Sequence, residues 1–239
     1  MASVCACGDY FEVNNDGELC LKPGVQGLRD IVYVKEPGNH QFVKDDYPWL
    51  ARIKVRVQAA GGGAAGATAA AGQLVTRPGG AGGGYSEALI DAATLGAVES
   101  VVVGAGGEAG GTSSDGGAGG NSSFGGFVVA NGGAGGTAVM TSGTSLQCYS
   151  GIPAPLAGSG DWASGGGAGG GCIRLSGTDG LAGEGGESHL GHGGFQRASN
   201  GGGAPRGYGG GAAGGYARDD SSTPGTEGGN GIVIIELYG

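Results

Sequence analysis

The 239-residue chain has little of what several functional classes need. It contains no lysine after Lys54, and its 12 basic residues are outnumbered by 21 acidic ones, which gives a net charge of −9. An acidic chain without a basic patch interleaved with aromatic residues repels polyanions, so we expect no nucleic-acid binding. No apolar run approaches the ~20 residues of a membrane-spanning helix, and the N-terminus lacks the basic start and apolar core of a secretion signal. We therefore expect a protein that is made in the cytoplasm and does not insert into a membrane.

Motifs of catalysis are also missing. The sequence has no Gly-x-Ser-x-Gly elbow, phosphate-binding loop or H-E-x-x-H motif, and no recognisable pair of catalytic carboxylates. Residues 101–109 superficially match the dinucleotide-binding fingerprint, but the glycine-rich residues 110–117 cannot form the helix that must follow it. We expect a protein that is not an enzyme and carries no cofactor.

Residues that bind metals do not form a recognisable set. His189 and His192 lie near two glutamates, but the surrounding glycines argue against a helix that would align the two histidines, so we expect exposed loop residues. The five cysteines lack the paired C-x-x-C spacing of a zinc site. Cys5 and Cys7, with Cys20, could hold a metal or cross-link subunits, or they could be free thiols in a reducing compartment, which is the simpler interpretation.

Glycine, by contrast, is abundant. All but six of the 63 glycines lie between Ala59 and Gly231. They do not recur at every third position, which excludes collagen, and they alternate with β-branched or aromatic segments such as 98–103, 124–130 and 232–238, which a flexible linker does not need. We expect an ordered structure built around glycine, with mobile loops on a small β-domain as the alternative.

Ordering so much glycine is costly. Each glycine loses about 0.5–1 kcal/mol more on folding than alanine does, and has no side chain to bury. Extended helices with three residues per turn, packed so closely that only glycine fits between them, offer compensation through backbone hydrogen bonds. Segments such as 131–136, with the sequence Asn-Gly-Gly-Ala-Gly-Gly, fit this polyglycine-II packing.

The predicted strands alternate with these glycine runs. Residues 10–13 and 18–21 flank an Asn-Asn-Asp-Gly turn and predict a hairpin. Ile53, Val55 and Val57 alternate with basic residues, which is typical of a half-buried strand. Further strands are expected at 30–34, after the turn at 37–42, at 85–90, 98–103 and 124–130, and at 232–238. The last is so apolar that it should be central in a sheet or buried against a partner.

The order of these segments resembles the glycine-rich domain of bacteriophage tail fibres and tail-tip adhesins. The resemblance covers roughly residues 37–239, and it is carried by segments 37–42, 54–63, 101–107, 121–126 and 231–236 taken together. It implies a mostly β fold with little or no α-helix, in which short strands are combined with a sandwich of polyglycine-II helices. Residues 1–36 lie outside the resemblance and are expected to attach the protein to other tail proteins or to mediate oligomerisation.

The resemblance implies a virion protein of the phage tail whose loops meet a polysaccharide or protein of the host surface. Large residues in the glycine-poor segments 141–162 and 175–216, and just after them, are the candidate receptor contacts, because such groups stack on sugars or anchor interfaces. These candidates are Tyr149, Trp162, Phe195, Arg197, Arg206, Tyr208, Tyr216 and Arg218. They could instead cover the ends of the glycine lattice, which would favour a purely structural fibre or tail-tip protein. A homotrimer is expected by the same resemblance.

Overall fold

The computed structural model describes residues 8–22 and 27–239, and this part of the chain is made of strands and extended segments. Helical structure within it is limited to two short 3-10 turns, η1 (Lys44–Asp46) and η2 (Ala92–Thr94). The expected mostly β fold with little α-helix is confirmed. Across these described residues, no helix is both long and apolar enough to span a membrane.

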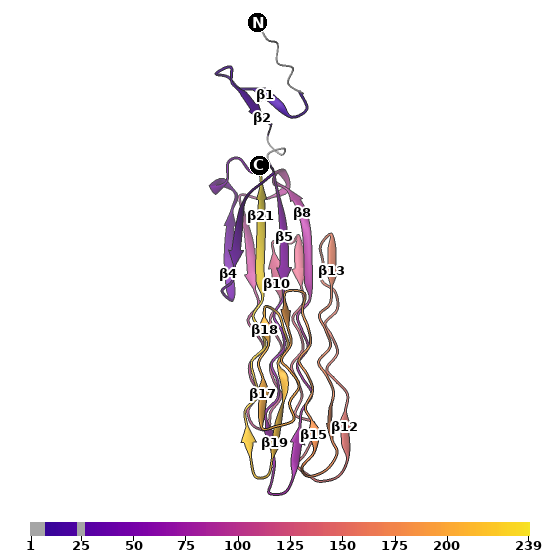
Figure 1. Cartoon of the computed structure of the whole chain (residues 1–239). Coiled ribbons are helices and arrows are strands. Elements are labelled where there is room, and N and C mark those ends of the chain that lie inside the picture. The colour runs from indigo at the N-terminus through magenta and orange to yellow at the C-terminus, as the bar shows by residue number, and fades with distance from the viewer. Residues whose placement is uncertain (1–7, 23–26) are drawn as a thin grey trace.

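Two antiparallel sheets form a sandwich at the end of the molecule that holds the C-terminus (Figure 1). The five-stranded sheet has the order β13 (Trp162–Ser164), β8 (Tyr85–Asp91), β5 (Arg52–Gln58), β21 (Ile232–Tyr238) and β3 (Leu28–Val34). The four-stranded sheet has the order β11 (Val128–Ala130), β10 (Ser122–Phe124), β9 (Val98–Val103) and β4 (Gly38–Val43). As expected, the apolar strand β21 is paired on both sides, by β5 and β3.

The core of the sandwich follows from the alternation in these strands. Ile53, Val55 and Val57 of β5 are fully buried and belong to one apolar cluster with Val101 and Phe124 of the opposite sheet. The segment 124–130, predicted to be a strand, is a hairpin instead, because Gly125 adopts φ 51° and lets the chain reverse between β10 and β11.

Beyond the sandwich the chain forms a lattice of extended glycine-rich segments. The central one is segment 59–66, whose N–H groups donate to neighbouring segments with a period of three residues. Ala60 and Gly63 donate to 117–120, Gly61 and Ala64 donate to 226–229, and Gly62 donates to Ala81. Its carbonyl groups accept with the same period from three further segments, 107–110, 133–136 and 212–215. A period of three and bonds to six neighbours are the pattern of packed polyglycine-II helices.

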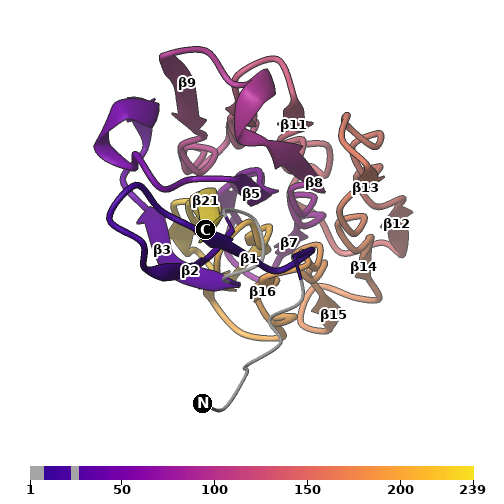
Figure 2. The same cartoon turned by 90° about the horizontal axis from the view of Figure 1, so that it is seen from above.

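The lattice is a solid interior rather than a set of loops. Residues 57–67 and 74–86 are buried throughout. Segment 79–84 repeats the period of three, because its N–H groups donate in turn to 167–170, 209–212 and 131–134. Figure 2, seen along the long axis, shows such segments packed side by side. The alternative of mobile glycine loops on a small β-domain is therefore wrong for this structure.

Short strands are interspersed with the extended segments; β16 and β18 lie near the sandwich, and several of the others lie toward the far end of the lattice (Figure 1). They are β6 (Ala67–Thr68), β7 (Leu74–Thr76), β12 (Gln147–Tyr149), β14 (Cys172–Arg174), β15 (Gly180–Leu181), β16 (Gly191–His192), β17 (Gly201–Gly203), β18 (Arg206–Gly207), β19 (Ala213–Arg218) and β20 (Ser222–Thr223). They pair in small sheets with the orders β12-β14-β15, β17-β19-β7, β16-β18 and β20-β6.

The N-terminal hairpin forms as expected from β1 (Phe11–Val13) and β2 (Leu19–Leu21). The domain boundary differs from the expected position between residues 36 and 37, because β3 pairs along its length with β21. Strand β3 therefore belongs to the five-stranded sheet, and the glycine-rich domain begins by Leu28. The sequence signal failed here because β3 reads as an ordinary strand with no glycine run beside it.

Candidate functional site

Six loops gather at the end of the lattice farthest from the C-terminus (Figure 1). We call them the distal loops; they comprise residues 68–73, 111–115, 141–146, 175–179, 197–200 and 219–222. Ser, Thr, Asn and Asp are frequent in them, and most of their residues are exposed. The topology explains why they meet, since each connects two extended segments that run the length of the lattice.

The distal loops are hydrogen-bonded to one another. The Ser142 hydroxyl accepts from the Ala70 N–H at 2.9 Å and donates to the Gln73 side chain at 2.7 Å. Thr68 contacts the Ser222 hydroxyl at 2.8 Å and donates to the Thr112 carbonyl group at 3.0 Å. These bonds join loops that are distant in sequence, so the surface they present is held in one arrangement.

The buried side chain of Arg174 anchors one of these loops. Only 4% of the residue is exposed, and its guanidinium donates to the carbonyl groups of Leu74, Thr141 and Ser145 and to the amide oxygen of Gln147. An arginine can satisfy so many acceptors because its five N–H donors lie in a rigid plane. The loop 141–146 is therefore held in position by a guanidinium group that is almost fully buried.

Apolar side chains are exposed beside this anchor. Leu146 and Leu175 are 69% and 53% exposed, and they are adjacent in sequence to Gln147 and Arg174, which are directly paired across β12 and β14. Leu146 directly precedes β12 and Leu175 directly follows β14, so the two leucines lie at the same end of this strand pair. Sequence reasoning missed this pair because it looked for aromatic and basic residues; the signal was two leucines in segments otherwise rich in Ser, Thr and Gly.

The structure brings only some of the predicted contact residues to the distal end. Arg218 is exposed there, and its guanidinium donates to the Thr178 carbonyl oxygen at 3.3 Å. Arg197 is partly buried and donates to the Asn200 carbonyl oxygen, while Tyr149 lies on β12 and its hydroxyl accepts from Gln147. The prediction that Tyr216 contacts a receptor is wrong, because this residue is 1% exposed and packs in the interior beside Leu74. It is a packing residue rather than a contact residue.

Trp162 lies elsewhere, on the edge strand β13 of the sandwich. It is 48% exposed, and its ring packs edge-on against Tyr85 and His189, with centroids 5.5 and 5.7 Å away. Tyr208 is partly buried, and its carbonyl oxygen accepts a hydrogen bond from Ser188. Neither residue belongs to the distal loops, so the predicted set does not form one site.

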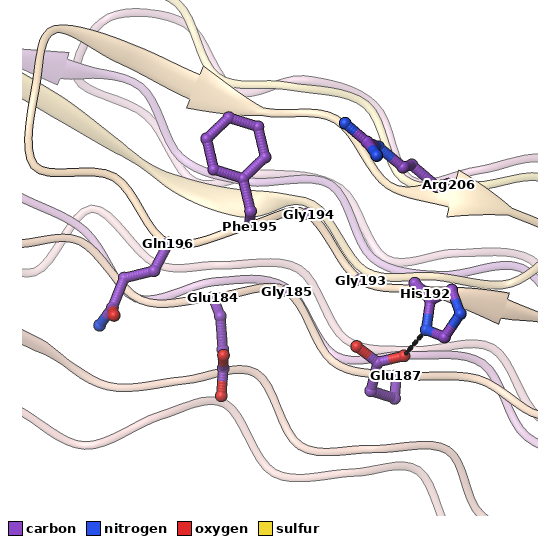
Figure 3. Close-up of a pocket in the computed structure, with 9 residues that line it drawn as sticks. All are labelled: Glu184, Gly185, Glu187, His192, Gly193, Gly194, Phe195, Gln196 and Arg206. Carbon is purple, nitrogen blue, oxygen red and sulfur yellow. Dashed lines mark hydrogen bonds and ion pairs between the residues drawn. The ribbon is translucent and has the colours of Figure 1, made fainter.

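Phe195 and Arg206 line a groove of about 460 Å³ on the side of the lattice (Figure 3). Its other side chains are Glu184, Glu187, His192 and Gln196, and its remaining lining residues are glycines. His192 Nδ1 lies 2.9 Å from Glu187 Oε2, and both side chains are well exposed. The histidines are thus exposed or aromatic-packed, and no group of three metal-binding side chains occurs within residues 8–22 and 27–239.

Cys20, Cys148 and Cys172 are free thiols, and burial raises the pKa of Cys172. The expectation for Cys5 and Cys7 lies outside the described residues. In the distal loops, hydrogen bonds from Thr178 and Ser176 lower the pKa of Asp179, so this side chain stays ionised and fixes the turn.

Comparison with known proteins adds no relative. A scan against protein-family models finds no match, and a search of curated proteins finds none with significant similarity.

Proposed function

We propose that this chain is a component of a bacteriophage tail fibre or tail tip and acts as a non-catalytic adhesin, whose distal loops contact a polysaccharide or protein of the host surface. The sequence resemblance motivates the assignment to a phage tail. The observation that carries the adhesin role is the position of the distal loops, which lie across the lattice from the end where the N-terminal region joins the domain. That end is marked by the hydrogen bond from the Gly239 N–H to the Gly27 carbonyl oxygen.

The arrangement suits presentation of a binding surface at the end of a rod. A lattice bonded in all directions resists bending, and the hydrogen bonds among the loops reduce the ordering cost of binding. Apolar side chains that a partner covers gain free energy by leaving water, and Leu146 and Leu175 are the large exposed apolar side chains of the distal loops. The N-terminal region would attach the chain to other tail proteins, and several copies, in a homotrimer or otherwise, would add avidity to a weak contact.

The alternative is a structural tail-tip or fibre protein without receptor contact. It requires that the exposed side chains be covered by other subunits. The exposure of Leu146, Leu175 and Phe195 in the single chain supports the adhesin, but a neighbouring subunit over the distal loops would reverse that preference.

Direct binding to cells tests the proposal. Labelled full-length protein is incubated with intact cells, and with isolated envelopes, of a panel of bacterial strains, and is then competed with excess unlabelled protein. We expect saturable, competable binding to at least one strain. Folded protein that binds no strain would favour the structural alternative.

Substitutions in the distal loops test whether these loops make the contact with the cell surface. The double substitution Leu146→Ser with Leu175→Ser should weaken binding at least ~10-fold, because burial of one leucine side chain contributes about 1.5–3 kcal/mol, and it should leave the melting temperature unchanged. Leu156→Ser is the matched control, because Leu156 is 84% exposed and its carbonyl oxygen is bonded by Asn131, near the sandwich. Equal binding by both variants would remove the distal leucines from the contact.

A further inference from the structure

The lateral groove of Figure 3 is a direct product of the polyglycine-II repeat. Two antiparallel segments, 183–188 and 191–196, are joined by the hydrogen bond from the Gly185 N–H to the Gly194 carbonyl oxygen, 2.8 Å. A Cβ on Gly185 would lie 1.9 Å from the Gly211 carbonyl oxygen, and a Cβ on Gly194 would lie 2.0 Å from that of Gly203. Side chains can therefore project only from the positions between the glycines, and the floor of the groove is bare backbone.

The projecting positions recur every three residues. Glu184 and Glu187 stand on one segment, and His192 and Phe195 stand on the other, so each pair is separated by one turn, roughly 9 Å at ~3.1 Å per residue. Arg206 stands on a third, neighbouring segment, beside the second row, because it is paired with His192 across β16 and β18. The volume of about 460 Å³ lies within the ~300–1,000 Å³ of small-molecule sites.

The side chains of the groove combine aromatic, acidic, basic and amide groups. Phe195 is 55% exposed, and the Arg197 guanidinium lies 5.1 Å from its ring centroid, which holds the ring in place. Glu184 and Arg206 form no ion pair with any described residue, so one carboxylate and one guanidinium keep their hydrogen-bonding capacity for a ligand. An aromatic face, two carboxylates, an amide and a guanidinium thus surround one flat floor.

Three ligand classes fit this set poorly. An anion would be repelled by Glu184 and Glu187, a metal ion lacks a group of three ligands in the described chain, and a purely apolar molecule would strip water from charged groups. A sugar ring fits better. Its C–H face is apolar and can stack on an aromatic ring, while its hydroxyl groups both donate to carboxylates and accept from guanidinium and amide groups.

We propose that the lateral groove binds a neutral saccharide, stacked on Phe195 and hydrogen-bonded by Glu184, Glu187 and Arg206. This site is separate from the distal loops, and it does not require that the distal loops bind a receptor. In an adhesin it would supply a second, weaker contact along the side of the rod.

Saturation-transfer NMR with the purified full-length protein tests the site. The probes are neutral tetrasaccharides of glucose, mannose, galactose and N-acetylglucosamine, each added singly, with dextran sulfate as the anionic probe. We expect transfer to at least one neutral probe, with a Kd near ~1 mM, as for a single weak contact. Absence of transfer to every neutral probe, or transfer to dextran sulfate alone, would overturn the proposal.

Two groove variants and two matched controls complete the test. Phe195→Ala and Arg206→Ala should each weaken the binding at least tenfold, while Leu156→Ala and Arg218→Ala, at exposed positions outside the groove, should not. All four side chains are exposed, so unchanged melting temperatures are expected. Saccharide binding that survives both groove variants would overturn the assignment. The Leu146→Ser and Leu175→Ser double variant should keep its saccharide binding, which separates this result from that of the cell-binding experiment.

Discussion

The amide nitrogen of Gly133 lies 2.9 Å from the carbonyl oxygen of Ala60, which places segment 131–136 in direct contact with the central segment of the lattice. At this approach there is no room for a side chain. A Cβ on Gly133 would lie 2.1 Å from the Ala81 carbonyl oxygen, which is backbone and cannot move aside.

Replacement of this glycine should therefore prevent folding. We expect Gly133→Val to yield insoluble protein or to lower the free energy of unfolding by about 3 kcal/mol or more, at or above the upper end of the range for overpacked cores. Gly126→Ala is the control, because a Cβ there meets nothing within 4 Å. Thermal unfolding followed by circular dichroism measures both, and a folded Gly133→Val of normal stability would contradict the lattice.

The position of β3 predicts different outcomes for two truncations. Removal of residues 1–26 leaves β3 and Gly27 in place, so we expect a soluble protein with an unchanged melting temperature. Removal of residues 1–36 also takes away β3 and exposes one edge of the apolar strand β21, which should cause aggregation. Size-exclusion chromatography and thermal unfolding compare the two. If both truncated proteins behave alike, β3 is dispensable to the sheet.

Arg174 should control the order of one distal loop more than the stability of the whole domain. In Arg174→Met the acceptors that it satisfies lose their partners, and each buried acceptor left unsatisfied costs about 1–3 kcal/mol. We expect hydrogen exchange to accelerate strongly in residues 141–147 and much less in segment 59–66. Arg218→Ala, on an exposed side chain, serves as the comparison. Unchanged exchange in 141–147 would show that the loop is held by its other contacts.

The Glu87 carboxylate should make a pH-dependent contribution to the free energy of unfolding. Partial burial raises the pKa of Glu87, but the hydrogen bond from Tyr85 and the charges of Lys54 and Arg56 outweigh it, so the pKa falls below its ordinary value of 4.5. A carboxylate whose pKa is lowered by folding stabilises the protein above pH 4.5, and this contribution is lost as the pH falls through the lowered value.

The measurement compares the wild type with Glu87→Gln in urea unfolding from pH 7 to pH 3. The wild type should be the more stable protein at pH 7, and the difference should shrink below pH 4.5. A difference that stays constant across this range would mean that the charge of Glu87 does not contribute.

Much of the fold could be predicted because it depends on local patterns. The alternation of Ile53, Val55 and Val57 with basic residues indicated β5, and the apolar run from Ile232 to Tyr238 indicated a central strand, since both signals are properties of one segment. The exclusion of collagen also needed only the order of the glycines along the chain, whereas the choice between an ordered lattice and mobile loops needed the structure.

The candidate site was less accessible to sequence reasoning. Tyr216 and Arg218 are two residues apart, and one is buried while the other is exposed, which depends on how β19 packs and not on residue type. Trp162 and Tyr149 lie in one glycine-poor segment but on strands of different sheets. Such separations arise from the three-dimensional path of the lattice, and a pattern within a single segment does not encode them.

The central segment 59–66 is held by main-chain groups bonded to six neighbours, and every residue except proline carries the same N–H and C=O groups. The scaffold therefore places almost no demand on the chemistry of the loops at its end. One distal loop could be exchanged for another of different composition without a compensating change in the body. The lattice in this sense separates the stability of the rod from the composition of its distal loops, so that the surface at that end can change without a change in the body that carries it.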